Sequence, residues 1–242
     1  MNLKQFYDNK YTKAISASVI DYNRHPISRY EAAVKYFSDN FNGESILEIG
    51  CGNGCVAHSI LKHANVSRYV ATDLSNNRLK GIAKTSRLEV MRIDAERFDF
   101  SAIGTFDAII MIAVIEHLVD PLKVMRNIKA ALKPGGFVYI DTPNIADYGS
   151  RFKLLTGRFP STASKDEGLT TYDNHRVAMY DEGHLHYFTY RSLAGMMLYA
   201  GFASAKYHYP VGRLMLGRAA HYLLSRLWPE MFSPVVLICI HS

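Results

Sequence analysis

A glycine-rich turn at residues 50 to 54 constrains the fold of this chain more than any other feature. The apolar run Ser45-Ile46-Leu47 leads into the segment Glu48-Ile49-Gly50-Cys51-Gly52-Asn53-Gly54, which is typical of a strand that ends in a turn and opens onto a helix. Three glycines at alternate positions leave no Cβ atoms between a ligand and the backbone. This pattern predicts the nucleotide-binding corner of an α/β protein.

The residues around the turn indicate the kind of ligand. Cys55 stands where the dinucleotide fingerprint G-x-G-x-x-G has its third glycine, the residue that allows the close helix-strand approach of a pyrophosphate site. Glu48 places a negative charge that suits an ammonium group and repels a diphosphate. We expect the N-H groups of the turn to face the ligand, where they can bind a carboxylate. An amino-acid-like ligand such as S-adenosylmethionine satisfies both conditions, and a turn without a ligand is the alternative.

Further apolar runs end in a polar or acidic residue every 21 to 25 positions, as in a βα repeat. In such sheets ligands bind at the carboxyl ends of the strands. Asp73 lies 23 residues after Gly50, where a carboxylate can accept hydrogen bonds from both ribose hydroxyls, and Asp94 ends the next run. Either aspartate alone could be a helix N-cap or a turn former. Their joint placement favours a binding site.

Five segments carry a family resemblance that spans roughly residues 30 to 144. They are "ILEIGCGNG", "ATDLS", "RIDAERF", "FDAIIMIAVIEHLVDP" and "LKPGGFVYIDTPN". Together they resemble the motifs of the class I S-adenosylmethionine-dependent methyltransferases. Residues 184 to 202 are also similar to a later segment of the branch that includes the ubiquinone O-methyltransferases. The resemblance implies an α/β fold with a Rossmann-like seven-stranded sheet, helices on both faces and an antiparallel last strand.

The resemblance also assigns the cofactor-binding residues. The residues expected around the methionine part are Glu48, Gly50, Cys51, Gly52 and Gly54. The remaining contacts are Asp73 and Leu74 at the ribose, Asp94 and Ala95 beside the adenine, and Ile112 and Ala113 closing the pocket.

We expect one domain of 242 residues in four parts. Residues 1–43 form a helical cover with a helix over 28–41, and residues 44–144 form the cofactor-binding core. Residues 145–188 form a mostly irregular insertion after the fifth strand, which is predicted to be a lid over the acceptor. Residues 189–242 provide a helix and two strands, at 203–210 and 234–241.

The join at 211–233 mixes apolar residues with Arg213, Arg218 and Arg226. It could be a covering helix, a dimer contact or a membrane-surface foot. The net charge is +6, and the lysine and arginine residues are spread along the chain without forming a run. We therefore do not expect nucleic acid as a partner. Three cysteines without metal spacing or an even disulfide framework, and no leader segment, predict a cytoplasmic protein.

Three histidines are candidates for the base that would deprotonate an alcohol or phenol: His117, His184 and His186. His117 follows Glu116 in "AVIEHL", which resembles the Glu-x-x-Glu-His metal signature of some quinone and RNA methyltransferases. Ala113 stands in place of the first glutamate, so we expect no metal.

The sequence therefore predicts a methyltransferase that acts on a small-molecule acceptor, with O-methylation favoured over N-methylation. An RNA ribose methyltransferase and a non-catalytic partner subunit that only binds the cofactor are the alternatives. A nicotinamide-dependent oxidoreductase is disfavoured by Glu48 and Cys55.

Overall fold

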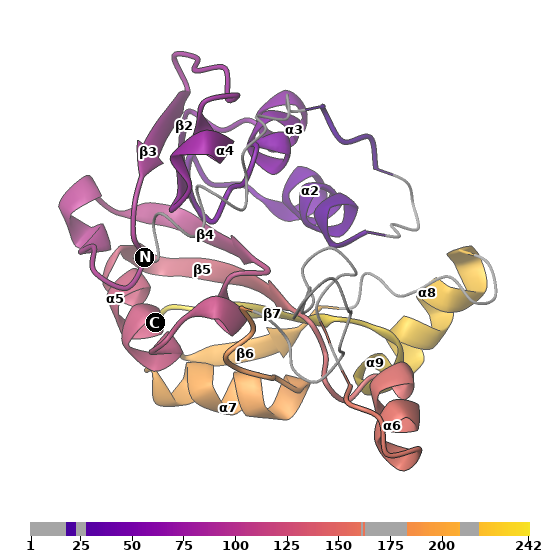
Figure 1. Cartoon of the computed structure of the whole chain (residues 1–242). Helices are drawn as coiled ribbons and strands as arrows, with labels where there is room; N and C mark the ends of the chain where they lie inside the picture. Colours follow the sequence, from indigo (N-terminus) through magenta and orange to yellow (C-terminus); the bar gives the residue numbers. More distant parts are fainter. Residues whose placement is uncertain (1–17, 23–27, 161, 163–182, 209–217) are drawn as a thin grey trace, which may run out of the picture.

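The computed structural model describes residues 18–22, 28–160, 162, 183–208 and 218–242. In this part of the chain seven strands form one sheet in the order β3-β2-β1-β4-β5-β7-β6. Strands β1 to β5 are parallel, and β7 is antiparallel to its neighbours β5 and β6. The predicted Rossmann-like sheet with an antiparallel last strand is confirmed, and Figure 1 shows helices on both of its faces.

The elements have the following bounds. The strands are β1 Ser45–Ile49, β2 Arg68–Asp73, β3 Leu88–Arg92, β4 Phe106–Ile112, β5 Leu132–Thr142, β6 Ser204–Tyr207 and β7 Val235–Ile240. The α-helices are α2 Arg29–Asn40, α3 Cys55–His63, α4 Asn76–Leu79, α5 Pro121–Ala130, α6 Tyr148–Leu155, α7 Tyr190–Tyr199, α8 Arg218–Leu227 and α9 Pro229–Phe232. Two 3₁₀ helices are η1 Phe100–Ile103 and η2 Ile115–His117.

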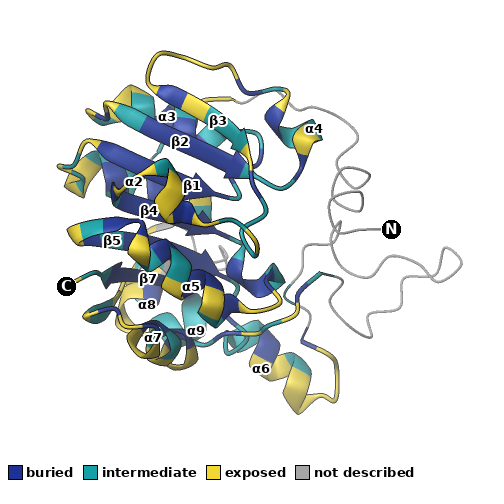
Figure 2. Cartoon of the chain, turned by 90° about the vertical axis from the view of Figure 1, so that its left-hand side faces the viewer, coloured by how far each residue is buried: buried dark blue, intermediate teal, exposed yellow. Residues whose placement is uncertain are grey.

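The central strands are buried on both faces, as expected for a parallel sheet covered by helices. Every residue of β1 is buried, and Figure 2 shows the continuous buried colour through the middle of the sheet. Leu47 and Ile49 belong to the core under α5 and α7, whereas Ile46 belongs to the core under α2 and α3. The alternation of side chains along one strand thus builds two cores.

Polar side chains cap the N-termini of α2, α5 and α7. Ser28 accepts a hydrogen bond from the backbone N-H of Glu31 at the start of α2. Asp120 caps α5 ahead of Pro121, and Thr189 caps α7 in a reciprocal capping box. Such caps satisfy N-H groups that the first helical turn leaves without partners. The predicted helix over 28–41 is therefore confirmed, within one residue at either end.

Pro134-Gly135-Gly136 is a combination typical of a turn, and it predicts the end of a helix before the fifth strand. This prediction is wrong, because the segment lies within β5, which begins at Leu132. The strand tolerates these residues because its pairing with β4 shifts register there, between Phe106 and Ala108. The described part of the insertion contains one helix, α6, which begins behind the N-cap Asp147. Residues 161 and 163–182 of the predicted lid lie outside the described residues.

The join between β6 and β7 contains two helices in its described part, α8 and α9. Residues 211–217, with Arg213, lie outside the described residues.

The two ends of the insertion after β5 are joined to each other, and we call this junction the neck. The backbone N-H of Ile145 donates to the carbonyl of Phe188 at 3.1 Å, and Asn144 forms a β-bridge with the same residue.

Candidate active site

The site lies at the carboxyl edge of the sheet, where β1 is flanked by β2 and β4. The chain leaves β1 towards β2 and β3 and returns on the other side to β4, so this is the switch point at which open α/β sheets bind ligands. Gly50, Gly52 and Gly54 follow β1 with φ of 76°, 58° and 78°. These values lie in the left-handed region that favours glycine.

The space around the turn also requires glycine at Gly50, whereas at Gly52 the neighbouring atom is the end of a flexible arginine side chain. A Cβ atom on Gly50 would lie 2.3 Å from Cγ2 of Val114, and one on Gly52 would lie 2.7 Å from Nη1 of Arg78. The three glycines therefore allow a tight turn, here called the glycine cradle, which packs against the side chains of Val114 and Arg78.

The hydrogen bonds of the turn correct one expectation. The N-H groups of Gly50 and Cys51 donate to the carbonyl of Thr72 at 2.8 and 2.9 Å, and that of Gly52 donates to Oδ2 of Asp73 at 2.9 Å. The sequence predicts that these N-H groups face a ligand, and for Gly50, Cys51 and Gly52 this prediction is wrong. They instead tie the turn to the end of β2, so the cradle is already rigid without a ligand.

Asp73 occupies the position expected for a ribose contact. Its Oδ1 accepts a second backbone hydrogen bond, from Ser75 at 2.8 Å, and each oxygen keeps a further acceptor position. Burial raises the pKa of Asp73, while the hydrogen bonds from Ser75 and Gly52 oppose that rise. Leu74 follows it directly in the chain.

Asp94 and Ala95 lie just past β3, which ends at Arg92. Asp94 is partly engaged in its own turn, since Oδ1 accepts from the N-H of Glu96 at 3.2 Å and its carbonyl accepts from Arg97 and Phe98. Its capacity to bind an adenine amino group therefore competes with a local structural role.

Glu48 is buried beneath the turn rather than exposed to a ligand pocket. Its Oε2 accepts a hydrogen bond from the hydroxyl of Tyr69 at 2.8 Å. Burial raises the pKa of Glu48 to about 7, and the bond from Tyr69 opposes this effect. A nearby cationic group would favour the ionised form of Glu48. Its role beside the methionine part of the cofactor stays a prediction.

Ala113 marks the end of β4 with an unusual backbone conformation. Its φ is 53°, the one positive value found at a non-glycine residue among the described parts of the chain. Its N-H donates to the carbonyl of Asp141 at 2.9 Å. Strain of this kind often occurs at functional sites, because the surrounding structure must hold the residue in place. Ile112 before it is buried.

Residues 183–186, at the end of the insertion, are hydrogen-bonded to residues 116–119, which follow β4, and we call this junction the clip. The N-H groups of Leu185 and His186 both donate to the carbonyl of Glu116, at 2.7 and 3.1 Å. His117 is hydrogen-bonded through Nδ1 to the carbonyl of Gly183. These contacts bring His184 and His117 together, with ring centroids 4.7 Å apart.

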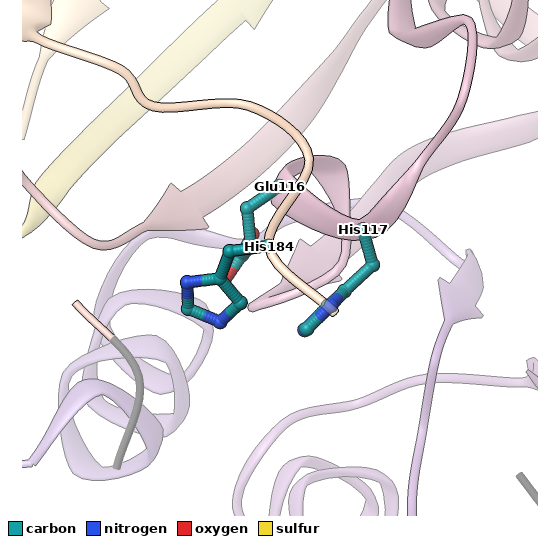
Figure 3. Close-up of side chains that lie close together, drawn as sticks. All are labelled: Glu116, His117 and His184. Carbon is teal, nitrogen blue, oxygen red and sulfur yellow. The ribbon is translucent and has the colours of Figure 1, made fainter. Parts of the chain in front are cut away.

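Figure 3 shows Glu116, His117 and His184 as one cluster, with the Glu116 carboxyl group behind the ring of His184. Their metal-ligating atoms lie within 4.8 Å of one another. Glu116 is buried and accepts from the hydroxyl of Thr142 at 2.9 Å, while its Oε1 has no hydrogen-bond partner among the described residues. Burial raises the pKa of Glu116 to about 7. A carboxylate and two imidazoles suit a transition metal better than magnesium.

Two further titratable residues, His186 and Asp141, do not belong to this cluster. His186 places Nε2 at 3.3 Å from the carbonyl of Val119, so the structure does not bring it to the other two histidines. Asp141 is buried and pairs with Arg29, whose Nη1 lies 2.9 Å from Oδ1. Burial raises the pKa of Asp141, and the guanidinium of Arg29 opposes the rise.

Sequence reasoning did not include Arg29, Thr142 or Tyr69 in the site. Tyr69 and Thr142 stand in strands whose ends were predicted to form the site, so the strand register was the signal that could have found them. Arg29 is the first residue of α2, 112 positions from Asp141, and no local pattern connects the two.

Comparison with known proteins identifies the fold family. A family model described as "Methyltransferase domain" matches residues 22–206. A ubiquinone biosynthesis O-methyltransferase of Aliivibrio fischeri is 30% identical over 119 residues, covering 46% of this chain and 50% of that protein. A tRNA U34 carboxymethyltransferase of Campylobacter curvus is 33% identical over 120 residues, covering 48% of this chain and 39% of that protein. The chain thus spans about half the length, or less, of these relatives.

A solved structure supports the same fold over the whole chain. The S-adenosylmethionine-dependent methyltransferase from Archaeoglobus fulgidus aligns with a TM-score of 0.58 at 13% identity, covering 99% of this chain and 100% of that one.

Proposed function

The chain belongs to the class I S-adenosylmethionine-dependent methyltransferases, and we propose that it transfers a methyl group to an oxygen atom of a small molecule. Members of the family bind S-adenosylmethionine, and the glycine cradle with Asp73 at its edge fits that cofactor. The bound cofactor would supply an electrophilic methyl group, which would pass to an acceptor oxygen as the carbon–sulfur bond breaks and the thioether S-adenosylhomocysteine leaves.

The position of His117 carries the proposal of O-methylation. A carbonyl oxygen can only accept a hydrogen bond, so the contact with Gly183 places the ring proton on Nδ1. The neutral ring then has its lone pair on Nε2, where it can take the proton of an acceptor hydroxyl. A side chain held in one tautomer by a backbone carbonyl is well suited to act as a general base.

The neighbours of His117 support this role. Proton transfer leaves a positive charge on the imidazole, and the buried Glu116 beside it can balance that charge. His184 is held through its Nδ1 by the hydroxyl of Thr162 at 2.8 Å and is the second candidate for the base. The clip between residues 183–186 and 116–119 closes this side of the site, which helps to exclude water.

An acceptor screen with matched variants tests the proposal. The full chain is incubated with labelled S-adenosylmethionine and a panel of phenols, catechols and sugars. We expect His117→Gln to lower kcat by about a hundredfold or more while the affinity for S-adenosylhomocysteine stays unchanged. His186→Gln, at the same clip, is the control and is expected to retain most activity. A greater loss in the control would assign the base to His186.

A tRNA acceptor is the second candidate, because the Campylobacter curvus relative is named for a tRNA modification. Bulk tRNA in the same assay separates the two acceptor classes. Cofactor binding without product from any acceptor, small molecule or RNA, would favour a non-catalytic partner subunit.

A further inference from the structure

Large apolar side chains are exposed on α6 and α8, at the end of the molecule seen at the lower right of Figure 1. Their exposed fractions lie between 55% and 84%. The residues of this α6–α8 surface are Phe152, Leu154, Leu155, Leu223, Leu227 and Trp228. Trp228 directly follows α8.

Contacts around α9 hold the two helices at the same end of the molecule. The rings of Tyr148, in α6, and Phe232, in α9, lie 5.6 Å apart. Asn144, before α6, donates through Nδ2 to the carbonyls of Glu230 and Ser233, both at 3.0 Å. α9 is joined to α8 through Trp228, whose N-H donates to the carbonyl of Leu224. The exposed apolar residues therefore belong to one region of the fold.

The same segments carry only positive charge. Residues 148–160 contain Arg151, Lys153 and Arg158, and residues 218–228 contain Arg218 and Arg226, with no aspartate or glutamate in either range. The two acidic residues that adjoin these ranges in the sequence have other roles. Asp147 caps α6 through the N-H of Ser150, and Glu230 pairs with Arg191 at 3.2 Å.

We propose that the α6–α8 surface docks this protein on a lipid membrane with anionic headgroups. Aromatic and leucine side chains flanked by lysine and arginine are the residues that lie in the headgroup boundary of a bilayer, and basic residues add attraction to anionic lipids. None of the described helices is long and apolar enough to cross a membrane, so the contact is peripheral. The inference does not rest on the proposed acceptor.

Two other occupants, a second copy of this chain and a single-stranded RNA, fit the surface less well. In a two-fold dimer the same patch of both copies would meet, which would place basic residues of one copy against those of the other. A single-stranded RNA would be bound by stacking on aromatic rings, whereas four of the six exposed residues are leucines.

Vesicle co-sedimentation tests the proposal with the full chain and phosphatidylcholine vesicles, with and without phosphatidylglycerol. We expect binding only to the anionic vesicles, and weaker binding at high salt, since salt screens the basic residues. Leu155→Ser combined with Leu227→Ser should lower the bound fraction about tenfold, and so should Arg151→Gln combined with Arg226→Gln. Leu198→Ser, at a half-exposed leucine of α7, is the control and should leave binding unchanged.

Retained S-adenosylhomocysteine binding shows that each variant is folded. The proposal is overturned if the chain ignores anionic vesicles, if the paired variants bind as well as the unaltered chain, or if Leu198→Ser has an equal effect. Sedimentation equilibrium that shows a dimer lost in the leucine pair would identify a second copy as the occupant instead. Release of the chain from vesicles by single-stranded RNA, with tighter binding to that RNA, would identify RNA.

Discussion

The proposed cofactor side and the proposed acceptor side of the site are built in different ways. On the cofactor side, the turn after β1 satisfies its N-H groups with Thr72 and Asp73, and its shape depends on glycine. On the acceptor side, Glu116, His117 and His184 come from two distant segments, and a buried carboxylate oxygen has no hydrogen-bond partner among the described residues. The first side is fixed by local backbone geometry, and the second by long-range contacts between polar groups. This contrast predicts that the two sides respond differently to mutation, pH and chelators.

The largest effect is expected from Gly50→Ala, which attacks the backbone geometry of the cofactor side. The new Cβ atom would lie 2.3 Å from Val114 and would force alanine into a left-handed conformation. We expect the free energy of unfolding to fall by about 4 kcal/mol, and cofactor affinity to be lost. Chemical denaturation and calorimetric titration with S-adenosylhomocysteine measure both quantities.

Gly135→Ala is the matched control for this substitution. Gly135 has a φ of 75°, but nothing lies within 4 Å of the Cβ position. It should cost about 1 kcal/mol for the backbone conformation alone. Equal losses in the two variants would show that the close approach of Val114 does not matter.

The next largest effect is that of pH on the stability of the protein, through Glu116 on the proposed acceptor side. The pKa of Glu116 is about 7 in the folded protein, against 4.5 as its ordinary value. The folded state therefore binds more protons than the unfolded state between these values, so stability falls as the pH rises from about 4.5 to 7. The contribution of this one group is at most about 3 kcal/mol. Arg29 and Asp141 face the same carboxyl group, and Asp141 and Glu48 add losses of the same sign.

The substitution Glu116→Gln isolates the contribution of this residue to the pH dependence of stability. Denaturation from pH 4.5 to 8 should show a flatter decline of stability in Glu116→Gln than in the unaltered chain. Glu89→Gln, at an exposed glutamate, should keep the full decline. Parallel curves for all three proteins would contradict a raised pKa at Glu116.

A smaller effect is expected from Asp73→Ala on the cofactor side. The substitution removes an acceptor for the ribose and for the N-H groups of Gly52 and Ser75. Affinity for S-adenosylhomocysteine should fall by roughly 1 to 3 kcal/mol, and Asp94→Ala should cost less because Asp94 is engaged in its own turn. Titration with a nicotinamide dinucleotide should show no binding. Tight binding of that ligand alone would overturn the assignment of the cofactor.

The smallest expected effect is that of a chelator. The sulfonium needs no Lewis acid, and Ala113 provides no ligand, so methyl transfer should survive exhaustive chelation. Loss of turnover that zinc or magnesium restores would instead make Glu116, His117 and His184 metal ligands, and the acceptor side would be a metal centre.

The two sides also differ in how far the sequence predicts them. The turn, the position of Asp73 and the helix over 28–41 were predictable because each depends on residues close together in the chain. The direction of the turn N-H groups was not, since it depends on the position of Thr72 across the strand pair. The approach of His184 to Glu116 and of Arg29 to Asp141 depends on the tertiary packing of segments 68 and 112 positions apart, and no periodicity encodes it. The role of each histidine as a base stays a prediction.

The neck between Asn144 and Phe188 has a consequence for how such proteins diversify. Because Ile145 and Phe188 are joined by a backbone hydrogen bond at the edge of the sheet, the ends of the segment between them are held together by the core. Doubling the length of a loop whose ends are closed costs only about 0.6 kcal/mol of extra entropy. The segment between the neck residues can therefore change in length at little cost to the fold, which allows the acceptor side to vary while the glycine cradle stays intact.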